Sequence, residues 1–160
     1  MLKKLIISLV FLCTVSTISY SQEKFTVSGE VKFPKKKGVI ILMLLTQEEF
    51  VKDEPATPER KLMIKPDSQQ LKAKKVSFKF VDVPKGTYAI YCIQDLNENG
   101  EMDYIAGSSG FLRRPQEPSG YSGPIFLGVL WSDVKFEVDK DISGIKIAVS
   151  GKWANERKLN

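Results

Sequence analysis

The sequence predicts an all-β protein, a single antiparallel β-sandwich of about seven strands, of the immunoglobulin-like or transthyretin-like type, preceded by a signal peptide. Three observations lead to this prediction. Apolar and polar residues alternate with period two in several short segments. Turn-forming residues separate these segments at intervals of roughly 8–12 residues. No segment of useful length has a helical period, and 160 residues suffice for one domain with its own core.

The first 21 residues have the layout of a secretory signal peptide. A basic start is followed by an apolar run over 5–15, and Ser19 and Ser21 then place small residues ahead of a cut before Gln22. The run is shorter than the roughly 20 residues that span a bilayer. Leu12 precedes Cys13 where lipid attachment would need a small residue, so we expect soluble export to the periplasm, cell surface or extracellular space. Residues 22–151 then form the sandwich and 152–160 a polar tail.

The strands are expected in order along the mature chain. Residues 25–33, 76–81 and 145–149 alternate with period two, and 87–94 are rich in β-branched and aromatic residues. The unbroken apolar run 39–45 predicts a strand buried on both faces. Prolines and charges over 46–75 predict long loops, with a short edge strand near 61–64. Residues 126–131 and 134–138 are expected to form one bent strand or two.

Composition excludes several kinds of chemistry. The chain has no histidine, which excludes histidine triads and histidine-containing zinc sites. Cys92 is the lone cysteine after signal cleavage, and its apolar neighbours predict a buried, inert thiol. Net charge falls from +5 to +3 without Lys3 and Lys4. The lysine runs 35–37 and 72–75 therefore indicate solvated turns and no nucleic-acid binding, while attraction to an anionic glycan or membrane stays open.

The stretch 95–103, DLNENGEMD, is the part of the sequence that suggests specific chemistry. Asp95, Asn97, Asn99 and Asp103 stand at loop positions one, three, five and nine, with Gly100 at position six. This is the spacing with which a tight loop wraps calcium, a cation that takes 6–8 oxygen ligands. The backbone carbonyl of Glu101 would supply the seventh position. The sequence therefore predicts a calcium-binding loop.

The loop departs from an EF-hand in two respects. It follows a strand and not a helix, and position twelve is Ala106 in place of a bidentate glutamate. The missing oxygens must come from elsewhere, with Glu117 as the first candidate and Asp133 as a weaker one. The alternative is a hairpin turn whose Asn and Asp side chains cap their own backbone without a metal.

Three motifs in a fixed order resemble a known family. The segments VPKGTYAI (83–90), QDLNENGEMD (94–103) and PQEPSGYS (115–122) are similar to the "lP-x-G-x-YA", "hD-x-N-x-NG-x-x-D" and "P-[KQ]-E-x-x-G-[FY]-S" motifs of DUF2141, a family of exported bacterial proteins. The resemblance covers about 25–149. It implies a β-sandwich and export, and no activity. Gln94 stands where the family often has histidine, and the stretch 107–114 is longer than usual.

These observations predict a non-enzymatic exported module that binds or supports an envelope protein or glycan. It would have no nucleic-acid partner and no transmembrane span in the mature chain. The alternative is a carboxylate-dependent hydrolase of sugars or esters that uses Asp95, Asp103, Glu117 and Asp133. A third hypothesis is assembly through exposed edge strands. The aromatic residues Tyr121, Phe126 and Trp131 could line a binding surface, although core positions are more usual for such residues.

Overall fold

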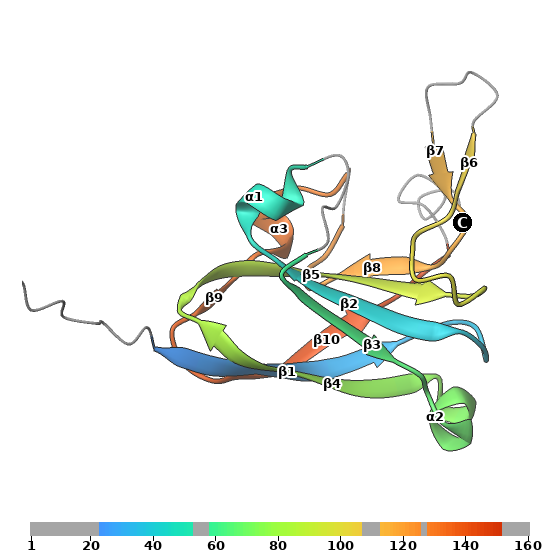
Figure 1. Cartoon of the computed structure of the whole chain (residues 1–160), viewed down its shortest axis with the longest axis horizontal. Coiled ribbons are helices and arrows are strands. Elements are labelled where there is room, and N and C mark those ends of the chain that lie inside the picture. The colour runs from blue at the N-terminus through green and yellow to red at the C-terminus, as the bar shows by residue number, and fades with distance from the viewer. Residues whose placement is uncertain (1–22, 53–57, 107–112, 126–127, 152–160) are drawn as a thin grey trace, which may run out of the picture.

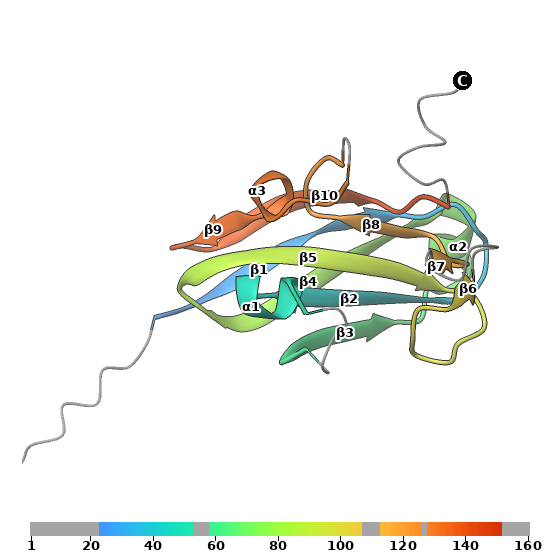
Figure 2. The same ribbon diagram turned by 90° about the horizontal axis from the view of Figure 1, so that it is seen from above.

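The computed structural model describes residues 23–52, 58–106, 113–125 and 128–151. The predicted signal peptide at 1–21, the tail at 152–160 and Phe126 lie outside the described residues. The first strand begins at Lys24. Two sheets face each other across a central apolar layer, with short helices beside them (Figures 1 and 2).

Strand pairing defines two main sheets and a separate ribbon. The first sheet has the order β10 (Ile142–Ala148), β1 (Lys24–Lys32), β4 (Lys75–Pro84). The second has the order β3 (Arg60–Ile64), β2 (Val39–Leu45), β5 (Gly86–Asp95), β8 (Ser119–Tyr121), and β9 (Phe136–Val138) also pairs with β5. The ribbon consists of β6 (Tyr104–Ala106) and β7 (Arg113–Pro115). The helices are α1 (Gln47–Phe50), α2 (Ser68–Ala73) and α3 (Trp131–Val134).

Strand β2 confirms the prediction from its apolar run, because all of its residues are buried. Ile40, Leu42 and Leu44 join the central core between the sheets. Val39, Ile41, Met43 and Leu45 point to the other side, where Phe50, Tyr91, Ile93 and Met102 pack against them. Full burial of each such side chain contributes about 1.5–3 kcal/mol. A strand covered on both sides therefore anchors the whole second sheet.

The structure corrects three parts of the predicted fold. Strands β1 and β10 pair in parallel, so the sandwich is not purely antiparallel. The described part of 126–131 contains no strand, and α3 occupies 131–134, whereas the strand expected over 134–138 is present in part as β9. The region 46–75 contains two capped helices as well as the expected edge strand β3. Within the described ranges, no helix combines the length and apolar character needed to cross a bilayer.

Several loops meet at the end of the sandwich where β5 finishes. Asp95 at the end of β5 pairs with Val39 at the start of β2, and Ile64 at the end of β3 pairs with Ile40. The β1–β2 turn, α2 and the loop after β5 consequently lie at the same end (Figures 1 and 2). This end carries the predicted calcium loop.

Candidate functional site

Asp95 organises the loop that follows β5. Its side chain is fully buried. Oδ1 accepts a hydrogen bond from the backbone N–H of Glu98 and Oδ2 accepts one from Gly100, both at 2.7 Å. These bonds support left-handed backbone at both partners, with φ of +61° at Glu98 and +87° at Gly100. Glycine adopts this conformation without strain, whereas glutamate does so at a cost. One carboxylate therefore fixes the sharp reversal predicted from the Asn-Gly sequence.

Asn97 and Asn99 continue the same pattern along the loop. The Oδ1 of Asn97 accepts from Asn99 N–H at 3.2 Å, and the Oδ1 of Asn99 accepts from Glu101 N–H at 2.9 Å. Their Nδ2 groups donate to the two carboxylate oxygens of Asp103, at 2.7 Å from Asn97 and 3.1 Å from Asn99. The predicted residues at positions one, three, five and nine therefore form one hydrogen-bonded loop.

Glu117 lies against this loop, as the sequence suggested. Its side chain is 5% exposed. Oε1 accepts from Leu96 N–H at 2.6 Å, and Oε2 accepts a longer bond from Asp103 N–H at 3.4 Å. Burial raises the pKa of Glu117, the two backbone bonds oppose this, and the charges of Asp95 and Asp103 raise it further. The structure therefore gathers three carboxylates at one end of β5.

Two lysines of the edge strand region hold the outside of the loop. Lys61 donates from Nζ to the carbonyl oxygen of Gly100 at 3.0 Å, and Lys65 forms a 2.8 Å ion pair with Glu98. These lysines precede their partners by 39 and 33 residues. Sequence reasoning missed them because nothing in the pattern of the 46–75 region shows which strand it pairs with.

Gln94 positions the neighbouring β1–β2 turn. It is fully buried, and its Oε1 accepts from Lys35 N–H at 3.2 Å. Its Nε2 donates to the carbonyls of Lys35 and Lys37 at 2.7 and 2.8 Å. Gly38 has φ of +88°, and a Cβ there would lie 2.1 Å from the carbonyl oxygen of Asp95. The side chain of Gln94 thus fixes the β1–β2 turn to strand β5.

The loop offers oxygen atoms for a cation, but its present arrangement is not a metal cluster. Among the described residues, no three His, Cys, Asp or Glu side chains are grouped to hold a metal. Each acceptor oxygen of Asp95, Asn97 and Asn99 has a second lone pair beyond its backbone bond. The carboxylate of Asp103 faces amide N–H donors, so a cation would have to replace those two bonds. The donor set fits calcium, whereas the geometry at Asp103 would need to change.

The other candidate residues lie away from this loop. Asp133 is in α3, which packs beside the first half of β5, where Phe136 pairs with Tyr88. Asp133 therefore cannot complete a site at the end of the same strand. Burial raises the pKa of the Cys92 thiol, and its side chain is fully buried, as predicted for an inert cysteine.

The aromatic candidates pack on the outer side of the second sheet. Tyr121 stacks on Tyr91 with ring centroids 4.7 Å apart, and Trp131 lies 5.3 Å from Phe50. Both are partly buried rather than part of the central core. Desolvation raises the pKa of Tyr121 to about 12.

A family model described as an uncharacterized protein conserved in bacteria, DUF2141, matches residues 19–145. The chain belongs to the DUF2141 family. The match spans the sandwich from before β1 into β10, and it includes the loop and Glu117. Neither a curated protein nor a solved structure matches the chain.

Proposed function

We propose that this DUF2141 protein is an exported, non-enzymatic β-sandwich module of the immunoglobulin-like or transthyretin-like type. Its loop 95–103 would bind calcium, and the module would bind or support an envelope protein or glycan in the periplasm, at the cell surface or outside the cell. The signal-peptide layout of residues 1–21 supports export. The observation that carries the calcium proposal is that Asp95 and Glu117 both accept hydrogen bonds from the backbone of the loop that contains Asp103. The three carboxylates would have to move closer together to share one ion.

Electrostatics supports a cation at this loop. Burial raises the pKa of Glu117, and the charges of Asp95 and Asp103 raise it further, which means that each of these aspartates repels the Glu117 carboxylate in the folded protein. A divalent cation would relieve this repulsion. The lysines nearby do not, because Lys61 and Lys65 bond to the Gly100 carbonyl and to Glu98.

The ligands would be those of the loop and one residue outside it. Asp95, Asn97, Asn99 and Asp103 would contribute side-chain oxygens, Glu101 its backbone carbonyl, and Glu117 a carboxylate from the segment after β7. With few formal charges in the loop, we expect a Kd on the order of 10⁻⁴–10⁻³ M, the range of extracellular calcium modules. The ion would hold the loop and the segment containing Glu117 together as one rigid rim.

The hydrogen bonds favour this non-enzymatic function over a hydrolase. Both carboxylate oxygens of Asp95 and both of Glu117 accept backbone N–H bonds. These oxygens keep a second lone pair, but a general acid or nucleophile must also contact a sugar or ester substrate, and Asp95 and Glu117 are only 0% and 5% exposed. Asp133, the fourth carboxylate of the alternative, belongs to a different region of the sandwich.

Thermal unfolding with increasing calcium tests the proposal. For the expected Kd, about 10 mM calcium stabilises the folded state by about 1.4–2.7 kcal/mol, a rise in Tm of several degrees. Asp103→Asn should abolish most of the rise because it removes the negative charge and one of the two oxygens of a ligand carboxylate. Glu101→Gln is the matched control, since it removes one charge from the same loop but keeps the backbone carbonyl. Equal melting with and without calcium, or equal loss in both variants, would contradict the proposal.

A further inference from the structure

One end of the sandwich carries a group of exposed lysines drawn from separate parts of the chain. They lie at the end of β1, in the β1–β2 turn, and around the junction of α2 with β4. We call this group the basic end, and it consists of Lys32, Lys35, Lys36, Lys37, Lys72 and Lys74, all exposed. The sequence predicts solvated turns for the same lysine runs and leaves open their attraction to an anionic glycan or membrane.

The fold brings these segments together by direct backbone contacts. Lys32 pairs with Lys75 across β1 and β4. The N–H of Phe33 donates to the carbonyl of Lys74 at 3.1 Å, which joins the start of the turn to the end of α2. Both views show the β1–β2 turn and α2 at the same end of the molecule (Figures 1 and 2). Two lysine runs that are separated in sequence thus form one charged surface.

No lysine of the basic end forms an ion pair among the described residues, although the acidic loop 95–103 lies at the same end of the sandwich. Ion pairs between described residues at this end join Lys75 with Glu30 and Lys65 with Glu98. Asp67, the acid nearest in sequence to Lys72, caps the N-terminus of α2 through its Oδ1.

At the opposite end of the sandwich, exposed acids outnumber exposed lysines. The acids are Glu23, Asp82, Glu137, Asp139 and Asp141, and the lysines are Lys24, Lys85 and Lys140. The contacts between Lys85 and Glu23 and between Thr26 and Asp141 place these segments together. Exposed lysines therefore predominate on the β1–β2 turn and α2, whereas exposed acids lie in the loop 95–103 at the same end and predominate at the opposite end. This uneven distribution orients the molecule in the field of a charged partner.

The basic end is presented on fixed backbone. Buried Gln94 bonds the main chain of Lys35 and Lys37, so the lysine turn keeps its conformation whatever its side chains contact. Lys74 has φ of +54° and ψ of +43° at the C-cap of α2. Glycine or asparagine is the usual residue there, and lysine adopts this conformation at a cost of about 1–2 kcal/mol. Ordered backbone reduces the entropy lost when the lysines bind an anion.

We propose that the basic end binds the phosphate headgroups of an anionic phospholipid membrane, by electrostatic attraction and without insertion. Segments 32–37 and 72–75 carry no exposed large apolar side chain, as the unburied hydrophobic residues lie elsewhere. These segments therefore have no large apolar side chain that could insert into the membrane. The lysines are spread over the end of the sandwich, an arrangement that fits a plane of headgroups.

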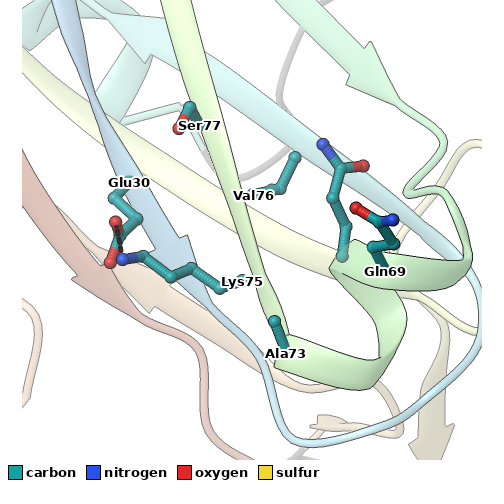
Figure 3. Close-up of a pocket in the computed structure, with 7 residues that line it drawn as sticks. Glu30, Gln69, Ala73, Lys75, Val76 and Ser77 are labelled. Atoms are coloured by element: carbon teal, nitrogen blue, oxygen red, sulfur yellow. Dashed lines mark ion pairs between the residues drawn. The ribbon is translucent and has the colours of Figure 1, made fainter.

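A linear polyanion fits this end less well because the nearby hollow is unsuited to it. The hollow between α2 and β4 has a volume of about 290 Å³. Figure 3 shows that Lys75 within it is paired with Glu30, and the remaining labelled residues are neutral. A groove for an anionic chain would instead be lined by unpaired lysines. This inference uses the proposed envelope location but does not depend on calcium binding.

Vesicle sedimentation tests the proposal, with calcium removed by EDTA so that the two proposals are judged separately. The purified protein is mixed with phosphatidylcholine vesicles, with and without phosphatidylglycerol, at about 50 mM and about 300 mM salt. We expect binding to the anionic vesicles at low salt and its loss at high salt. Each lysine near the surface changes affinity about fivefold, so Lys35→Gln, Lys36→Gln and Lys37→Gln together should weaken binding on the order of 100-fold.

The control variant removes the same charge from the opposite end by Lys24→Gln, Lys85→Gln and Lys140→Gln. It should keep vesicle affinity within about threefold of the unaltered protein. An equal loss in both triple variants would show that net charge alone is responsible and would overturn the proposal. Absence of binding to anionic vesicles, or binding to dextran sulfate without binding to vesicles, would also overturn it.

Discussion

Replacing Asp95 by asparagine should destabilise the protein even without calcium. Both oxygens of this buried carboxylate accept backbone N–H bonds at 2.7 Å. Asparagine keeps one acceptor and turns its amide N–H₂ toward the other backbone donor. Hydrogen bonds to a charged group are worth about 1.5–3 kcal/mol, and an unsatisfied buried donor costs about 1–3 kcal/mol. We therefore expect a loss of about 2–3 kcal/mol.

The assay is thermal unfolding in EDTA, followed by circular dichroism. In a domain of this size the expected loss lowers Tm by about 10 °C. Asp82→Asn is the control, because Asp82 is exposed and has φ of +54°, which asparagine adopts readily. A fall in Tm of less than about 2 °C for Asp95→Asn, or one equal to that of the control, would refute the assigned role of Asp95.

Further predictions concern stability, pH dependence and reactivity. Burial raises the pKa of Glu117 above its ordinary 4.5. Protonation of Glu117 therefore stabilises the folded protein fully below pH 4.5, and this stabilisation is lost as the pH rises through the raised pKa. Glu117→Gln should remove this pH dependence of the free energy of unfolding, measured with urea. Gln94→Leu removes the part-buried hydrogen bonds to the backbone of Lys35 and Lys37 and should cost about 1–3 kcal/mol in urea unfolding. Hydrogen exchange at the Lys35 amide should become faster, and unchanged exchange would contradict this. Lys74→Gly relieves about 1–2 kcal/mol of strain against about 0.5–1 kcal/mol of added chain entropy, so Tm should rise slightly while vesicle affinity falls about fivefold. Cys92 should react with a thiol reagent at the rate of global unfolding, and rapid labelling of the native protein would show that it is not buried.

The sequence predicts well those strands whose own residues show which faces are buried. The alternation over 25–33 and the apolar run 39–45 each specify which faces are covered, and both became strands. Parallel pairing of β1 with β10 could not be inferred, because it joins segments more than 100 residues apart whose own periodicity is the same in either direction. The apolar residues near 126–131 suggested a strand, but apolar character alone does not supply a pairing partner.

The sequence contains capping motifs that mark the starts of both helices in the 46–75 region. Thr46 and Glu49 form a capping box at the start of α1, and Asp67 with Gln70 forms one at α2. This spacing marks a helix start even where no apolar period follows. The prediction of loops rested on the prolines of the region and did not take these capping motifs into account.

The contacts of the loop 95–103 also include some that the sequence predicts and others that it does not. The spacing of Asp95, Asn97 and Asn99 predicts a calcium-binding loop, with a turn whose side chains bond their own backbone as the alternative. The structure has those backbone bonds, and calcium binding stays a prediction. The proximity of Glu117 was suggested by the order of the family motifs. The contacts of Gln94 and Lys61 depend on tertiary pairing across 39–59 residues, which no local pattern specifies.

The most direct test of the calcium proposal is a titration followed by the backbone amide resonances of the purified protein. The proposal predicts saturable shifts confined to residues 95–103 and the neighbourhood of Glu117, with one ion per chain and half-saturation on the order of 10⁻⁴–10⁻³ M. Magnesium, which demands a stricter geometry, should cause smaller changes. Amides of Glu98 and Gly100 that stay unshifted up to about 10 mM calcium would contradict the proposal.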